Sequence, residues 1–226
     1  MRTQGLRRLF AAGMVSLALS TSTSAQDSFW GGDDHTPSLA IAATEIQLDV
    51  PMPVSSGDMQ LMLALAGNGG GLADLKKEAI RNYTQHIHSE LARVLYGYLE
   101  DEEVPLVAEN GLLQLQNKLN LKVIKHLSAM KPKGDHDLEQ GNVTLKGEFR
   151  YILSNRSGTA LREQRVSIDD MKITEKYRVR TYHDNRAGED TTEAAIKEAL
   201  TEMVEELVEA MEDNLEADEL RDMAAL

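Results

Sequence analysis

The chain has 226 residues, with 24 lysines and arginines against 37 aspartates and glutamates, which gives a formal net charge of −13. It contains no cysteine, which excludes a disulfide scaffold, a Cys-ligated zinc module and an enzyme with a cysteine nucleophile. The acidic excess makes a general DNA-binding protein a poor candidate, because that affinity comes from cations that meet phosphates. Hydrophobic residues make up 42% of the chain, which is enough for one core at this length.

The first segment has the pattern of an export signal: a basic start with Arg7 and Arg8, an apolar run over residues 9–19, and small residues up to Ala25. The apolar run is too short to span the ~30 Å hydrocarbon core of a bilayer as a helix. We therefore predict a signal peptide over residues 1–25, cleaved after Ala25, and a periplasmic or secreted mature protein without a transmembrane anchor. The arginine pair fits part of the twin-arginine pattern, so the Sec and twin-arginine routes both stay open.

The mature N-terminus, residues 26–43, begins with a Gly- and Asp-rich stretch and is predicted to be disordered. Residues 44–50 then alternate apolar and polar side chains before two prolines, which indicates a short strand. Residues 58–66 are apolar, but the segment is too short to be assigned to a strand or to a helix. The glycine run over residues 67–71 is typical of a flexible connection.

Residues 72–98 have the period of an amphipathic helix. Apolar side chains recur every three or four positions, and charged or polar side chains fill the opposite face. The apolar positions are Leu72, Leu75, Ala79, Tyr83, Ile87, Leu91, Val94 and Tyr98. A helix of this kind is expected to bury its apolar stripe against a core.

Four segments follow in which apolar and polar side chains alternate, less cleanly in the third, and they predict antiparallel strands with one buried face. These segments are residues 113–127, 143–153, 160–168 and 171–180. Residues 154–158 have the composition of a hairpin turn between the second and third strands. Asp169 and Asp170 are interpreted as a second turn, so that the four strands form a meander.

A second amphipathic helix ends the predicted domain, from capping residues at 190–192 to about residue 215. Its apolar stripe consists of Ile196, Leu200, Met203, Val204, Leu207, Val208 and Met211. Residues 189–222 hold fourteen acidic residues against only Lys197 and Arg221, so most of the negative charge belongs to this part of the chain. The apolar stripe packs on the core or, alternatively, forms a short coiled-coil dimer. Residues 216–226 are predicted to be an acidic, frayed tail.

Together these elements predict an α+β fold in a single domain over residues 44–215. An antiparallel meander of four to five strands forms the sheet, and the two amphipathic helices pack on its apolar face because they are the elements able to cover it. The order strand, helix, meander, helix resembles small α+β modules of Gram-negative envelope lipoproteins, including the lipopolysaccharide-assembly type. The chain departs from that group in having no cysteine that could carry a lipid at the cleavage point.

The outward face of the predicted sheet is basic although the whole chain is acidic. Its basic residues are Lys118, Lys122, Lys146, Arg150, Lys172, Lys176, Arg178 and Arg180, and Glu148 is the main acidic residue among them. Lysine and arginine commonly fill solvated strand positions, where they discourage aggregation between sheet edges. Alternatively, a basic open face attracts an anionic partner such as lipopolysaccharide phosphates, an anionic glycan or an acidic protein.

No motif in the sequence specifies a reaction, and we predict neither a metal ion nor a cofactor. His136 and Asp137 are the candidates for a metal site, although an ordinary surface loop is the favoured interpretation of these residues. The sequence therefore favours a non-enzymatic binding or assembly module of the cell envelope that does not bind nucleic acid. A metal-dependent or carboxylate-based periplasmic hydrolase is one alternative, and a structural homodimer through the C-terminal helix is another.

Overall fold

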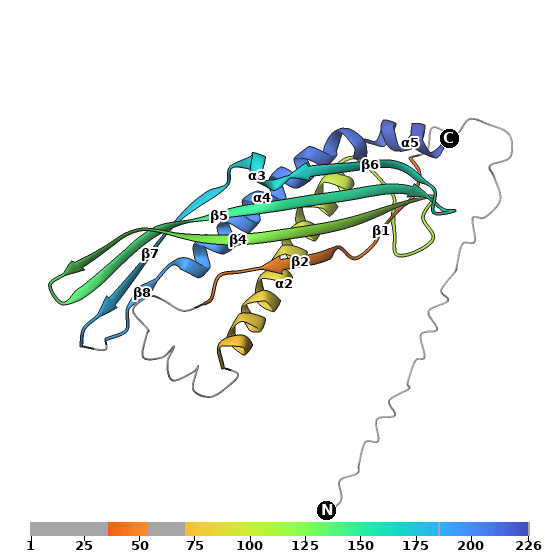
Figure 1. Cartoon of the computed structure of the whole chain (residues 1–226). Helices are drawn as coiled ribbons and strands as arrows, with labels where there is room; N and C mark the ends of the chain where they lie inside the picture. The colour runs from red at the N-terminus through yellow and green to blue at the C-terminus, as the bar shows by residue number, and fades with distance from the viewer. Residues whose placement is uncertain (1–35, 54–70, 185, 226) are drawn as a thin grey trace, which may run out of the picture. The chain divides into compact units, whose positions relative to one another are not determined.

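The computed structural model describes residues 36–53, 71–184 and 186–225, and within them the chain forms eight strands and four helices (Figure 1). The predicted signal peptide and the apolar segment over residues 58–66 lie outside the described residues. The described residues all belong to one unit, His35–Leu226. None of the helices in this part of the chain is long and apolar enough to cross a membrane.

A long hairpin forms the centre of the sheet. β4 (Leu113–Lys133) and β5 (His136–Asn155) pair antiparallel along their whole length. Gly134 begins the connecting turn with a φ of 60°, in the left-handed region that glycine adopts without steric cost. Odd positions of β4 from Leu113 to Val123 are buried while most even positions are exposed, which confirms the predicted alternation. The strand continues past a bulge after Leu127, farther than the pattern indicated.

β6 (Ala160–Ser167) and β7 (Thr174–Tyr182) both pair antiparallel with β5, one after the other along the same edge. The one-turn helix α3 (Ile168–Met171) separates them. The predicted reversal of the chain at Asp169 and Asp170 is therefore wrong, because the chain continues in the same direction. Ile168 is fully buried and the Gly147 N–H donates to Asp169 at 3.0 Å, so the short helix is held against β5.

The sheet is mixed and mostly antiparallel, which corrects the prediction of a simple meander. β1 (Leu39–Ile41) and β2 (Glu45–Asp49) pair parallel with β4, and β3 (Leu106–Val107) pairs parallel with β1. β8 (Glu189–Asp190) adds to the edge of β7. β1 lies in the segment that was predicted to be disordered, and its Leu39 is fully buried. A three-residue strand has too short a pattern to be predicted, because only its pairing with β4 orders it.

Two amphipathic helices, α2 (Gly71–Asp101) and α4 (Thr192–Leu215), cover one face of the sheet (Figure 1). Their buried side chains form one hydrophobic core with the inward side chains of β4, β5 and β7. Every residue of the predicted α4 stripe is at most 3% exposed. Because this stripe is buried within its own chain, it is not available to form the coiled-coil dimer that the sequence left open.

The C-terminal residues form a further helix, α5 (Ala217–Ala224), where the sequence predicted a frayed tail. Leu220 and Met223 are buried in the core, and the Arg162 guanidinium lies 3.3 Å from the Glu219 carboxylate. The prediction is therefore wrong for the described residues of this segment. The many acidic side chains of this segment make its two buried apolar positions hard to recognise in the sequence.

Candidate functional site

The candidate site is the sheet face that the two helices leave open. On β7, Tyr177 and Val179 are buried against the helices, so the alternating side chains of Lys176, Arg178 and Arg180 project from the opposite face. The same alternation places Lys118 and Lys122 of β4 and Lys146 and Arg150 of β5 on this open face. Lys172 ends α3 in a left-handed conformation with φ of 59°. The structure therefore brings the eight predicted basic residues to one side of the sheet or its margin.

One row of positive side chains crosses three adjacent strands and is neutralised by glutamates. Lys118, Arg150 and Arg165 occupy opposite positions on β4, β5 and β6. Three carboxylates contact this row: Glu45 lies 3.4 Å from Lys118, Glu163 lies 2.8 Å from Arg150, and Glu148 lies 3.8 Å from Arg165. The hydrogen bond from Arg150 is the main reason that the pKa of Glu163 is below its usual value. This row has little net charge to offer a partner.

A second group of lysines keeps more of its charge, and we name it the lysine cluster: Lys122, Lys146, Lys172 and Lys176. Lys122 and Lys146 stand directly opposite each other on β4 and β5. Lys146 has the Asp169 carboxylate at 3.3 Å, while the other three lysines form no ion pair among the described residues. Asp49 is opposite Lys122 in the strand register, but it forms its ion pair with Lys76 at 2.7 Å.

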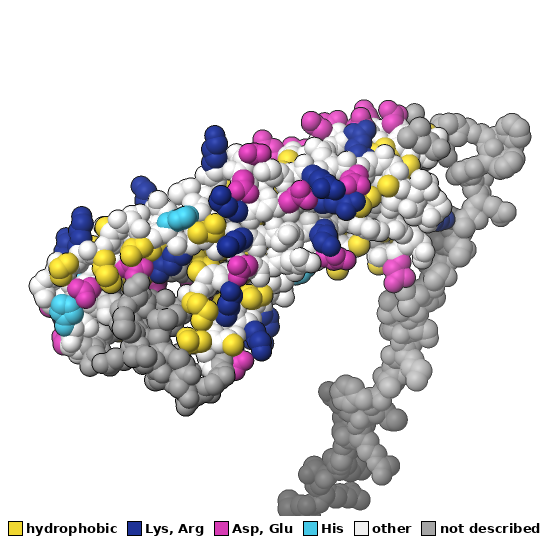
Figure 2. All heavy atoms as spheres, viewed as in Figure 1, with side chains coloured by type: hydrophobic (Ala, Val, Ile, Leu, Met, Phe, Trp, Pro, Cys, Tyr) yellow, Lys and Arg dark blue, Asp and Glu magenta, His cyan; other side chains and the backbone are white. Residues whose placement is uncertain are grey.

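Acidic residues are more evenly spread over this face than the sequence suggested. Figure 2 shows Lys and Arg side chains alternating with Asp and Glu side chains along the sheet. Arg178 is also paired, with the Glu189 carboxylate at 2.6 Å. The prediction that Glu148 is the main opposing acid is therefore wrong, since the partners come from β2, β6, α3 and β8. These contacts depend on strand pairing between distant segments, so the spacing along one strand gave no signal of them.

The end of the β4–β5 hairpin holds the residues that sequence reasoning singled out for metal binding. His136 Nδ1 lies 2.9 Å from the Asp135 carboxylate, and the Arg186 guanidinium lies 2.5 Å from the same side chain. These two hydrogen bonds, with His136 the larger cause, lower the pKa of Asp135 to about 2. Asp137 instead faces His183 at 3.4 Å. Within the described ranges no three His, Asp or Glu side chains are arranged to hold a metal ion.

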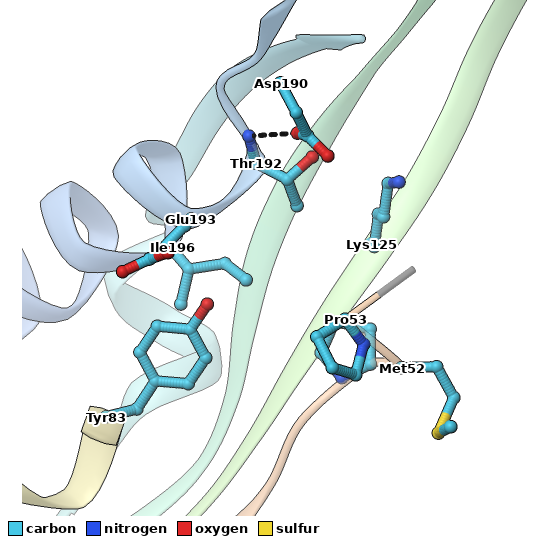
Figure 3. A pocket seen from close by; sticks show the side chains of 9 residues that line it. Met52, Pro53, Tyr83, Lys125, Asp190, Thr192, Glu193 and Ile196 are labelled. Carbon is cyan, nitrogen blue, oxygen red and sulfur yellow. Dashed lines mark hydrogen bonds between the residues drawn. The ribbon is translucent and has the colours of Figure 1, made fainter. Parts of the chain in front are cut away.

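A cleft of about 210 Å³ opens between the end of β2, the side of α2 and the start of α4 (Figure 3). Burial, followed by the charges of Glu193 and Asp190, raises the pKa of Tyr83 to about 12. The phenol therefore stays protonated at neutral pH and cannot serve as a base or a nucleophile there. Lys125, which also lines the cleft, is paired with buried Glu139 at 2.8 Å. The described walls thus contain no nucleophile paired with a base.

Comparison with known proteins bears on the fold. No protein-family model matches the chain, and no curated protein matches it. Among solved structures, a neuraminyllactose-binding hemagglutinin homolog from Helicobacter pylori is similar with a TM-score of 0.50 and 10% identity, over 88% of this chain and 97% of that one. At this identity the similarity defines a shared α+β fold and nothing further.

Two bacterial lipoprotein structures also match with lower scores. A minor lipoprotein from Acinetobacter baumannii has a TM-score of 0.29 and 13% identity, over 79% of this chain and 94% of that one. Lipoprotein GNA1162 from Neisseria meningitidis has a TM-score of 0.20 and 11% identity, over 78% of this chain and 99% of that one. Scores this far below 0.5 do not establish a shared fold.

Proposed function

We propose that the protein is a non-enzymatic binding or assembly module of the bacterial cell envelope, and that its lysine cluster engages an anionic partner. The observation that carries this proposal is the opposition of Lys122 and Lys146 on adjacent strands. Like charges directly opposite each other destabilise a sheet, because their Cβ atoms lie only about 5 Å apart. Of the two, Lys146 has the Asp169 carboxylate at 3.3 Å, while Lys122 has no ion pair among the described residues. An anion bound beside Lys122 reduces the repulsion, whereas Lys118 and Arg150 each already have a carboxylate of their own chain beside them.

The envelope location is supported by the predicted export signal in the first 25 residues. The chain shares its fold with a protein described as a hemagglutinin homolog, which fits a binding role without specifying the ligand. A hydrolase has less support, because no His, Asp and Glu side chains of the described residues are grouped to hold a metal ion and the described walls of the cleft at Tyr83 contain no nucleophile paired with a base. A binding module therefore accounts for more of what the described residues contain.

The chemistry of the lysine cluster favours phosphate groups. Lysine presents a compact positive charge that binds phosphate without requiring a fixed planar geometry. The neighbouring outward side chains on β4 and β5 include Ile124, Thr144 and His126, and none of these three is a Phe, Tyr or Trp on which a sugar ring could stack. We therefore propose the phosphates of lipopolysaccharide as the partner, in preference to a glycan stacked on aromatic rings or to an acidic protein.

The test compares two triple variants that remove the same number of positive charges. The first is Lys122→Gln, Lys172→Gln and Lys176→Gln, and the control is Lys118→Gln, Arg150→Gln and Arg165→Gln. At about 1 kcal/mol for each lysine near an anionic surface, the first variant should bind lipopolysaccharide roughly 100-fold more weakly. The control should lose much less affinity, because its charges are already neutralised by glutamates. Binding is measured by surface plasmon resonance over a range of salt concentrations.

Two results would overturn the proposal. Equal losses in both variants would mean that only the total charge matters and that the lysine cluster is not a site. Binding of wild-type protein to dephosphorylated lipopolysaccharide with unchanged affinity would show that phosphate is not what the protein recognises.

A further inference from the structure

A buried asparagine on the helix-covered face of the sheet has no hydrogen-bond partner within the described residues. Asn117 lies on β4 between the buried residues Leu115 and Leu119 and is 4% exposed. Neither its side-chain nitrogen nor its oxygen is hydrogen-bonded within the described structure. Leucine has the same number of side-chain heavy atoms, branched at the same carbon, and would suit this position in a hydrophobic core. The asparagine therefore needs an explanation, because buried amides in folded proteins are almost always paired.

The other buried asparagine in this part of the chain shows how the fold satisfies such a group. Asn214 of α4 is 7% exposed and donates to the Tyr151 hydroxyl at 2.7 Å and to Gln164 at 2.9 Å. Its oxygen accepts a hydrogen bond from Arg162. The contrast makes Asn214 a matched reference for Asn117.

A break in the neighbouring edge strand opens space beside Asn117. Ile41 at the end of β1 pairs with Leu115, and Glu45 at the start of β2 pairs with Lys118. Three residues, 42–44, therefore span the stretch in which β4 has only two. Because of the extra residue, this part of the chain leaves the hydrogen-bonded ladder with β4, as the extra residue of a β-bulge does. Two of the three residues are alanines, so their side chains do not refill the space.

Helix α2 covers this space and completes a cavity of about 270 Å³. Five of its residues line the cavity at spacings of three and four, which places them on one helical face. They are His88, Leu91, Ala92, Leu95 and Tyr96. Tyr96 is 48% exposed, so it stands where the cavity opens to solvent, whereas Leu91 and Leu95 are buried. The cavity thus has the buried side chains of Leu91 and Leu95 in its wall, the exposed ring of Tyr96 beside them, and one unpaired amide, and its described walls also include the polar side chains of His88 and Thr44.

We infer that this cavity binds a small ligand through an acetamido group, with Asn117 as the residue that recognises it. The Asn117 amide N–H can donate to an acetamido carbonyl oxygen, or its oxygen can accept from an acetamido N–H, so either group pairs one half of the amide. The acetamido methyl group would contact the aliphatic wall formed by Leu91, Ala92 and Leu95. The remainder of the ligand would lie against Tyr96 at the opening. This site is on the opposite side of the sheet from the lysine cluster, so it does not depend on the proposed function.

Titration of the purified protein with four small probes tests the inference. N-acetylglucosamine and N-acetylglycinamide carry the acetamido group on a sugar and on an amino acid amide. Glucose and glycinamide are the matched compounds without it. We expect one or both acetylated probes to bind, as detected by saturation-transfer NMR and by shifts in the melting temperature. Comparison of the two acetylated probes shows which source of the acetamido group the opening favours.

Three variants separate recognition from folding. Asn117→Leu should weaken binding of the acetylated probe by about tenfold or more and raise the Tm of the free protein by roughly 2 to 4 °C, because a buried unpaired amide has been removed. Ala92→Leu should block binding by filling the cavity while leaving Asn117 in place. Asn214→Leu should lower the Tm, because it leaves the groups around Tyr151 and Arg162 without their partner.

Two outcomes would overturn the inference. Failure of both acetylated probes to bind at millimolar concentration would mean that water alone satisfies Asn117. A lower Tm for Asn117→Leu, similar to that of Asn214→Leu, would show that Asn117 is part of the structural hydrogen bonding of the core. Unchanged probe binding by the Lys122, Lys172 and Lys176 variant confirms that the two sites are separate.

Discussion

Gly147 adopts a backbone conformation that few other residues tolerate. Its φ is 149°, and a Cβ atom at this position would lie 2.0 Å from the carbonyl oxygen of Asn120 on the neighbouring strand. Its N–H donates to Asp169 of α3 at 3.0 Å. The residue lies where β5 passes from pairing with β7 to pairing with β6. The absence of a side chain at Gly147 therefore permits both the close β4–β5 approach and the contact with α3.

Replacing Gly147 should destabilise the fold, whereas replacing an unconstrained glycine should not. We expect Gly147→Ala to lower the free energy of unfolding by at least about 2 kcal/mol, because the methyl group collides with the backbone of Asn120. Gly97 lies in α2, where an added methyl group would have open space within 4 Å. Gly97→Ala should raise the free energy of unfolding by about 0.5 to 1 kcal/mol. Urea denaturation of both variants checks this, and two changes of the same sign would contradict it.

At the scale of elements, α5 shows how a short helix can be held by two side chains. Leu220 and Met223 are three positions apart and both are buried. The Ala217 N–H at its start donates to the Glu102 carboxylate, which follows α2, at 3.3 Å. A short segment in which charged residues and alanines surround two larger apolar ones offers too little pattern for a helical period to be recognised. Its structure depends on the core that the rest of the chain provides.

Truncation of Leu220 tests whether α5 is part of the folded domain. Because the side chain is fully buried, Leu220→Ala should lower the free energy of unfolding by about 2 to 5 kcal/mol. Asp222→Ala, at an exposed position of the same helix, should change it by no more than about 0.5 kcal/mol. Chemical denaturation followed by circular dichroism measures both values. If Leu220→Ala leaves the free energy of unfolding unchanged, α5 is not part of the folded core, and the frayed tail that the sequence predicted is correct.

At the scale of the whole molecule, acidic side chains of α4 act on a carboxylate of the sheet. The pKa of Glu175 on β7 is raised, first by burial and then by the charges of Glu198 and Glu202 on α4. A carboxyl whose folded pKa is raised stabilises the fold in its neutral form. That stability is present at low pH and is lost as the pH rises through the folded pKa. At neutral pH the ionised Glu175 therefore works against folding.

Two substitutions should show opposite dependences on pH. Glu175→Gln should raise the Tm at pH 7, and the gain should disappear below about pH 4, where the wild-type carboxyl is neutral as well. Glu163 has a lowered pKa because of its hydrogen bond from Arg150, so Glu163→Gln should lower the Tm at pH 7. That loss should also disappear as the pH falls through the folded pKa of Glu163. Thermal melts from pH 3 to pH 8 check both signs, and a gain for Glu163→Gln at pH 7 would contradict the charge arrangement described above.

The sequence by itself determined the two long helices and the long strands, and the buried face of each. The alternation at residues 113–123 and the stripe from Ile196 to Met211 predicted what is buried, because burial of one face imposes a local period on strands and helices. Only the tertiary structure decided that β6 and β7 share one neighbour, that β1 and β2 run parallel to β4, and that Glu45 and Glu163 neutralise part of the basic face. It also decided the cavity at Asn117, which lies where the three residues between β1 and β2 are opposite only two residues of β4. These features depend on which distant segments become neighbours. The packing of the whole chain decides that arrangement, and the period within a single segment carries no information about it.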